Sequence, residues 1–190
     1  MILTAVPVLC TDGDIRLSAR TGPVASAISP NWRLALSVEY ELDLIDIGFV
    51  IDLPLSRYTQ GQSEGGEVLV LNSIGFMADV GYRSKIGKDW DLVFGSTLGA
   101  RSLAYETDSD NSNNPTDWIP FIPSSTVGSQ MYLVAAPYAQ VNYAVSRGYR
   151  FFVRIGYELH AGQDYLGIQA TDFSGFALQL GVKVPLSVSP

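Results

Sequence analysis

The chain has 190 residues, of which 47% are hydrophobic and only 16% are charged. Soluble domains carry a charged share of about 25%, so this composition argues against an ordinary soluble surface. The net charge of −7 disfavours nucleic acid as a partner, and a single cysteine excludes both an internal disulfide framework and a multi-cysteine metal site.

Residues 1–13 form an N-terminal segment that is mostly apolar and contains Cys10. No basic residue precedes the apolar stretch, so the segment is either the remnant of a secretory signal or a strand that follows the initiating methionine. The chain contains no run of about 20 apolar residues, which excludes a transmembrane helix. The remaining residues, 14–190, are long enough for one domain.

From residue 14 onward, apolar and polar side chains alternate in segments of ten or more residues that are separated by turn residues. In the clearest segment, Phe176, Leu178 and Leu180 alternate with Ala177 and Gln179. A period of two predicts β-strands with two different faces, and these lengths match membrane-crossing strands better than soluble ones. The predicted strands are 14–25, 32–42, 45–55, 74–83, 91–105, 131–145, 149–160 and 176–186.

The connections between these segments alternate in length. The short turns are at 43–44, 86–90 and 146–149, and the long connections are at 57–67, 106–130 and 162–173. Only the connection at 26–31 is shorter than this scheme prefers. Short turns at one end and long loops at the other are typical of membrane barrels. The sequence therefore predicts an all-β fold, an eight-stranded antiparallel up-and-down transmembrane β-barrel over 14–190.

The charges decide which face of the strands is inside. The apolar face carries no charge along its length, whereas the other face carries many charges next to small residues. A soluble, lipocalin-like barrel would reverse the faces, but eight strands enclose too little room for the bulky apolar set. We therefore expect a polar interior in which acids and bases pair as a structural core. The predicted interior residues are Arg16, Arg20, Arg33, Glu39, Glu41, Asp52, Asp79, Arg83, Arg101, Arg150, Arg154, Glu158 and Lys183.

This pattern resembles the small outer-membrane barrels of Gram-negative-type bacteria, namely the OmpA transmembrane domain, OmpX and OmpW. The resemblance covers 14–186 and rests on the pattern rather than on a motif. It implies a location in the bacterial outer membrane, periplasmic termini, surface-exposed loops and contact with lipopolysaccharide-type lipids. Members usually end on an aromatic residue, whereas here the last strand closes on Leu186 followed by Ser-Val-Ser-Pro.

Three functions remain open for a membrane barrel, and a fourth, a soluble lipocalin-like binder, would reverse every assignment of the faces. The first is a non-enzymatic envelope barrel with a structural, adhesion or partner-binding role through its loops, where Trp118 and Phe121 are the contact candidates for a protein partner. The second is an OmpW-like barrel that transports or binds a small apolar molecule through an opening lined by Tyr132, Tyr138 and 118–123.

The third function is a lipid A-modifying enzyme that would use His160 with Ser174 and either Asp164 or Asp172. The simpler interpretation of His160 is a histidine at the barrel mouth, bonded to Glu158 or to solvent. No cofactor and no metal are predicted, because the oxygen-rich segment 108–117 lacks the glycine and glutamate of a calcium-binding EF-hand loop.

Overall fold

The structure, a computed structural model, describes residues 14–27, 30–55, 58–60, 69–107, 126–146, 148–164 and 169–186. Within these residues the chain is almost entirely β-strand, with one short 3₁₀ helix. The strands are β1 (Asp14–Ser26), β2 (Pro30–Glu41), β3 (Ile45–Pro54), β4 (Tyr58–Gln60), β5 (Leu69–Lys85), β6 (Trp90–Thr107), β7 (Thr126–Ser146), β8 (Tyr149–Ala161) and β9 (Gly175–Pro185), and the helix is η3 (Ala170–Phe173).

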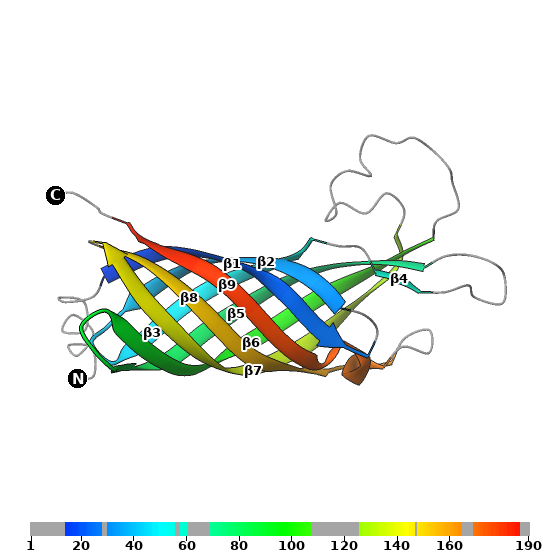
Figure 1. The fold of residues 1–190 in the computed structure, drawn as a ribbon. Coiled ribbons are helices and arrows are strands. Elements are labelled where there is room, and N and C mark those ends of the chain that lie inside the picture. The colour runs from blue at the N-terminus through cyan, green and yellow to red at the C-terminus, as the bar shows by residue number, and fades with distance from the viewer. Residues whose placement is uncertain are drawn as a thin grey trace, which may run out of the picture.

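Eight of the strands, all except β4, form a closed barrel in which each pairs with the strand before and the strand after it (Figure 1). The order is β3-β2-β1-β9-β8-β7-β6-β5, and a direct pairing of β3 with β5 completes the ring. Every pairing is antiparallel, as in the β1–β9 seam that joins the first and last strands. The predicted eight-stranded antiparallel up-and-down barrel is therefore confirmed.

All eight predicted strands are present, and three of them are longer than predicted by three residues or more. These are β5, β6 and β7, with 17, 18 and 21 residues. β6 and β7 extend into the predicted connection 106–130, whereas β5 starts five residues before the predicted strand. The short strand β4 pairs with the start of β5, and η3 forms just before β9. Both lie in segments that were predicted to be long loops.

The barrel has two different ends, which we call the turn end and the loop end. The turn end carries the start of β1, the end of β9 and the short turns after β2, β5 and β7 (left in Figure 1). In the turn after β7, Gly148 has a φ of +93°, a backbone conformation that side-chain-bearing residues rarely adopt. The loop end carries the longer connections that follow β3, β6 and β8.

The apolar side chains face outward and the polar ones face inward. In β9, Phe176 and Leu180 are 69% and 59% exposed, whereas Gln179 and Lys183 between and beside them are buried. The same alternation in β8 exposes Phe151 and Ile155 and buries Arg154 and Glu158. This burial pattern excludes the soluble, lipocalin-like arrangement, which would place the apolar face inside.

Candidate functional site in the barrel interior

The structure places every predicted interior charge on the inner face of the barrel. All are buried except Arg150, whose side chain is 18% exposed. The register of the sheet explains this placement: Arg16 of β1 stands opposite Glu39 of β2, so both side chains point to the same face. Ion pairs divide these side chains into three groups, which follow one another from the turn end to the loop end.

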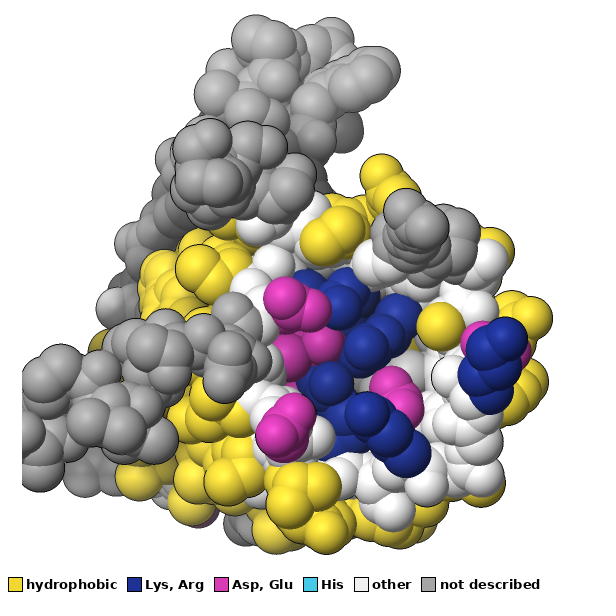
Figure 2. All heavy atoms as spheres, turned by 90° about the vertical axis from the view of Figure 1, so that its left-hand side faces the viewer, with side chains coloured by type: hydrophobic (Ala, Val, Ile, Leu, Met, Phe, Trp, Pro, Cys, Tyr) yellow, Lys and Arg dark blue, Asp and Glu magenta, His cyan; other side chains and the backbone are white. Residues whose placement is uncertain are grey.

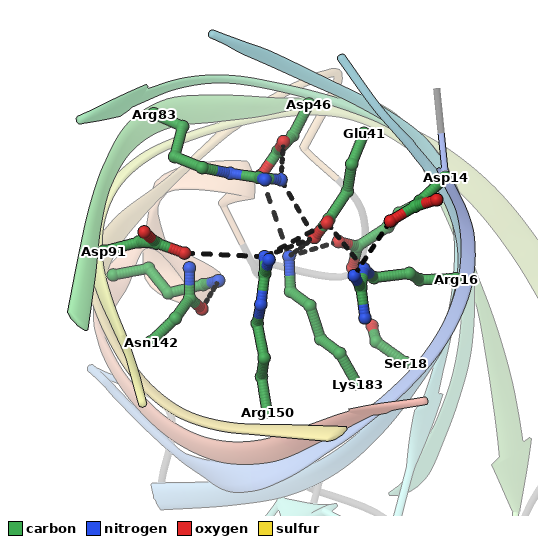
Figure 3. A network of polar contacts seen from close by, with 12 residues as sticks. Asp14, Arg16, Ser18, Glu41, Asp46, Arg83, Asp91, Asn142, Arg150 and Lys183 are labelled. Atoms are coloured by element: carbon green, nitrogen blue, oxygen red, sulfur yellow. Dashed lines mark hydrogen bonds and ion pairs between the residues drawn. The ribbon is translucent and has the colours of Figure 1, made fainter. Parts of the chain in front are cut away.

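The first group, which we call the turn-end cluster, fills the mouth of the barrel at the turn end. Figure 2 looks onto this mouth and shows basic and acidic side chains across its centre, with hydrophobic side chains around the outer wall. Figure 3 shows the same side chains pointing inward from strands on all sides. The cluster contains four bases and four inward-facing acids: Arg16, Arg83, Arg150, Lys183, Glu39, Glu41, Asp46 and Asp91. At its rim the exposed carboxylate of Asp14 also pairs with Arg16, at 3.2 Å.

Lys183 is the central cation of the turn-end cluster. Its Nζ lies 2.5 Å from a Glu39 oxygen, 3.6 Å from a Glu41 oxygen and 3.7 Å from an Asp46 oxygen. These three buried carboxylates converge within 4.8 Å, a grouping that could hold a metal ion. Here the ammonium group of Lys183 supplies the positive charge between them. The hydroxyls of Ser18 and Ser37 also bond Glu39, at 2.7 and 2.9 Å.

Glu41 is the carboxylate that the most cations share. It pairs with Arg16 at 2.5 Å, with Arg83 at 2.9 Å and with Arg150 at 3.0 Å, in addition to Lys183. Arg83, Arg150 and Lys183 each pair with two or more acids, whereas among the described residues Glu39 and Asp91 pair with one cation each, Lys183 and Arg150. The redundancy at Glu41 means that no single cation of the cluster is its sole partner.

The second group, which we call the central triad, consists of Arg20, Asp79 and Arg154. Arg154 donates to Asp79 at 2.7 Å and to Gln140 at 2.7 Å, and its guanidinium lies 3.6 Å from the centre of the Tyr138 ring. The Tyr138 hydroxyl donates to Asp79 at 2.6 Å. Arg20 reaches the same carboxylate only at 3.7 Å. Two guanidinium groups therefore share one carboxylate.

Two glycines make room for Tyr138 inside the barrel. A Cβ atom at Gly95 would stand 2.5 Å from the Tyr138 hydroxyl oxygen, and one at Gly81 would stand 2.9 Å from it. Both distances are shorter than any van der Waals contact, so a side chain at either position would displace the tyrosine. The glycines of β5 and β6 thus fix the position of the hydroxyl that bonds Asp79.

The third group, which we call the loop-end quartet, is a square of two bases and two acids. Arg33 pairs with Glu158 and, at 3.6 Å, with Asp52. Arg101 pairs with Asp52 and, at 3.2 Å, with the same Glu158 oxygen. The four charges come from β2, β3, β6 and β8, so the quartet crosses the whole width of the barrel.

His160 belongs to this end of the interior rather than to an open mouth. Its ring is completely buried, with Nε2 2.6 Å from Arg101 Nη1 and 3.9 Å from Glu158. The η3 helix lies above it, because Phe173 packs 6.1 Å from the His160 ring and 5.6 Å from the Tyr132 ring. Glu158 is thus near His160, as expected, but the close partner is Arg101 and the ring does not meet solvent.

The proposed enzyme set is not assembled around the His160 ring. The Ser174 hydroxyl accepts a hydrogen bond at 3.0 Å from the backbone N–H of His160, and the ring makes its contacts elsewhere. Asp172 accepts from the backbone of Gln169 at 2.9 Å, and Asp164 is exposed. A general base must lie within hydrogen-bond reach of the nucleophile it activates, and the described contacts of this ring do not provide that arrangement.

The strand pattern missed some members of the interior. Asp46 and Asp91 are absent from the predicted interior set, yet Asp46 is buried and both join the turn-end cluster. Asp46 lies six residues before Asp52 and therefore on the same face of β3, which is the signal that could have found it. The neutral residues Tyr132, Tyr138 and Asn142 are also buried inside. The loop candidates Trp118 and Phe121, and all of residues 1–13, lie outside the described residues.

Aromatic side chains mark both edges of the apolar outer wall. Trp90 and Tyr143 pack together at the turn end with ring centres 4.6 Å apart, and Tyr157 and Phe176 pack at 4.9 Å toward the loop end. Trp and Tyr concentrate where a membrane meets water. No helix in the described part of the chain is long and apolar enough to cross a membrane.

The barrel strands have 10 to 21 residues, and tilted strands of about 9–11 residues already cross a bilayer core. With an uncharged apolar wall outside and paired charges inside, the chain is a transmembrane β-barrel. No protein-family model matches it, and no curated protein matches its sequence.

Solved structures with the same fold are small outer-membrane barrels. Neisserial surface protein A aligns with a TM-score of 0.58 at 15% identity, covering 90% of this chain and 96% of that one. The N-terminal barrel domain of Pseudomonas aeruginosa OprF gives 0.53 at 12% identity, covering 92% and 100%. Yersinia pestis Ail, solved with the heparin analogue sucrose octasulfate, gives 0.52 at 12% identity, covering 92% and 97%. The predicted resemblance to small outer-membrane barrels is confirmed for the fold.

Proposed function

We propose that the protein is a barrel of the bacterial outer membrane that acts as a closed, non-enzymatic scaffold and presents its long connections to partners outside the cell. The observation that carries this proposal is the succession of the turn-end cluster, the central triad and the loop-end quartet through the interior. Together with Tyr132 and Phe173, these side chains occupy the space through which a solute would pass.

The small cavity at the level of the central triad supports a scaffold over a transport role. The cavity at the level of the central triad has a volume of about 30 Å³. A pocket for a small organic ligand measures roughly 300–1,000 Å³. Tyr132 and Tyr138, the residues expected to line an opening for an apolar molecule, are both buried in the interior contacts described above.

A conductance measurement tests the closed interior. The purified full-length chain, inserted into a planar lipid bilayer, is expected to show no steady conductance in 1 M potassium chloride. An Arg101→Ala and Arg33→Ala double variant, which removes both bases of the loop-end quartet, serves as the positive comparison if it inserts. A steady current through the unaltered barrel would contradict the proposal.

The outward role rests on the loop end. We propose that the connection 108–125, which contains Trp118 and Phe121, touches lipopolysaccharide or a protein partner, and that residues 1–13 precede the barrel as a separate segment. Support comes from the lengths of β6 and β7, the two longest strands, which lead into and out of this connection. The related fold of Ail also carries its own ligand, the heparin analogue, in its crystal structure.

Binding of lipopolysaccharide tests the loop proposal. Detergent-solubilised protein is titrated with purified lipopolysaccharide, and the Trp118→Ala and Phe121→Ala double variant should bind about tenfold more weakly, because aromatic contacts dominate most interfaces. Trp90→Ala, at the turn end, is the matched control and should bind normally. Equal affinity of both variants would contradict a contact through this connection.

A further inference from the structure

The three interior groups differ in their balance of charge. The turn-end cluster contains four bases and four inward-facing acids, beside the exposed carboxylate of Asp14, which pairs with Arg16 at 3.2 Å. The loop-end quartet contains two bases and two acids. The central triad contains two bases, Arg20 and Arg154, and the single acid Asp79. One positive charge is therefore unmatched, and it lies midway through a barrel that is surrounded by apolar side chains and lipid.

Arg20 is the unmatched member of the triad. Arg154 has close partners in Asp79, Gln140 and the Tyr138 ring, whereas Arg20 approaches Asp79 only at 3.7 Å. Within the part of the chain that the structure describes, Nε and Nη1 of Arg20 have no hydrogen-bond acceptor. The side chain is only 4% exposed, so bulk water does not take that role. A buried charge without a partner is strongly unfavourable.

A cavity adjoins this guanidinium group. It has a volume of about 30 Å³ and touches all eight barrel strands, with Arg20, Thr97, Gln179 and the apolar side chains of Ala35, Met77 and Ala177 in its wall. A space of this size holds roughly two water-sized particles. The cavity lies between the central triad and the loop-end quartet, because Arg154 lines it together with Asp52 and Glu158.

We propose that this cavity is a binding site for a small monovalent anion of the halide class, with chloride as the natural occupant and Arg20 as its principal ligand. The anion balances the unmatched charge and accepts the N–H groups of Arg20 that lack an acceptor. The volume leaves room for one water molecule beside the ion. That water donates to Oδ1 of Asp52, a residue that lines the cavity and whose Oδ1 has no donor among the described residues.

The same wall sets the selectivity of the site. Asp52 and Glu158 line the cavity, and Asp79 pairs with Arg20, the proposed ligand of the anion. A multivalent anion such as sulfate or phosphate therefore meets strong repulsion from these carboxylates. Those ions and organic carboxylates are also too large for a space of about 30 Å³. Halides combine a single charge with a small radius and a low requirement for donors, which matches one guanidinium group and apolar walls.

Crystals of the full chain grown in sodium bromide test the site directly. Anomalous scattering should reveal a bromide ion in the cavity within hydrogen-bond distance of the Arg20 guanidinium, and the peak should be absent in Arg20→Met crystals. Water in place of bromide at this position, with no anomalous peak, would overturn the proposal. Bromide at surface sites alone would overturn it as well.

Unfolding in urea gives an independent test that needs no crystals. If chloride binds with a dissociation constant of about 10 mM, then 200 mM sodium chloride should lower the unfolding equilibrium constant about 20-fold relative to sodium gluconate of equal ionic strength. Arg20→Met removes the unmatched charge together with the ligand, so this variant should fold and lose the chloride dependence. Arg150→Met, in the balanced turn-end cluster, is the matched control and should retain it. An unaltered protein that responds equally to both salts would also overturn the site.

Discussion

The turn-end cluster and the central triad place charges in the same narrow interior, but they differ in how many partners each charge has. Glu41 in the turn-end cluster is contacted by four cations, and Lys183 contacts three carboxylates. In the central triad, Asp79 is the only acid for two guanidinium groups. A cluster with redundant partners should tolerate the loss of one member, whereas a group with a single shared partner should not.

The largest effect is expected for Asp79→Asn. This change removes the only carboxylate of the central triad, the group with which both buried guanidinium groups, Arg20 and Arg154, form their ion pairs. Removal of one partner from a buried ion pair destabilises by about 3–5 kcal/mol, and we expect a loss at the upper end of that range. The measurement is urea unfolding in lipid vesicles followed by tryptophan fluorescence. Asp164→Asn, at an exposed carboxylate, is the control. A similar small loss of unfolding free energy in both variants would show that the buried Asp79 matters no more than an exposed carboxylate.

A smaller loss, about 2–3 kcal/mol, is expected for Arg154→Leu. The buried Asp79 keeps the Tyr138 hydroxyl and keeps Arg20 at 3.7 Å, so its charge is not left entirely unpaired. The same unfolding measurement applies. Combining Arg154→Leu with Asp79→Asn should cost less than the sum of the two single changes, because they disrupt one interaction. Strict additivity would contradict a direct pair.

Lys183→Met should destabilise by about 1–2 kcal/mol, less than either change in the central triad. Three carboxylates lose their common ammonium group, but Glu41 and Asp46 retain Arg83, and Glu39 retains two serine hydroxyls. Lys85→Met, at an exposed lysine of the same end, is the matched control. A loss greater than that of Asp79→Asn would reverse the comparison between the two regions.

The smallest effect is expected for Arg150→Met, below about 1 kcal/mol. Its side chain is 18% exposed at the mouth, so water already screens its pairs with Glu41 and Asp91. Raising the salt concentration should shrink the difference between this variant and the unaltered protein further. A salt-independent loss of several kcal/mol would mean that the turn-end cluster is not redundant at this position.

The sequence alone predicted the fold and the membership of the interior well, because period-two alternation reports directly on which way a side chain points. It missed β4 and η3, since three or four residues carry no periodic signal. It also shortened β5, where the segment Leu69-Val70-Leu71 is apolar on both faces and hides the alternation.

The partners inside the barrel could not be predicted in the same way. Arg154 and Glu158 lie four residues apart on the same face of one strand, which suggests that they pair. The partner of Arg154 is Asp79 on β5, and Glu158 pairs instead with Arg33 and Arg101. Strands tilt in a closed barrel, so two side chains meet across the interior according to stagger and tilt rather than sequence separation. That geometry exists only once the ring is closed.

Lys183 joins the last strand, β9, to β2 and β3 through ion pairs. Its three carboxylates lie on β2 and β3, whereas Lys183 lies on β9, which pairs with β1 only when the barrel closes. A sheet that ends at β8 holds Glu39, Glu41 and Asp46 together without their ammonium group. Like charges at such short distances repel, so the unfinished sheet is under electrostatic strain that insertion of β9 relieves. Lys183 therefore stabilises the closed barrel relative to a sheet that lacks β9. The same contacts oppose the separation of β9 from β1.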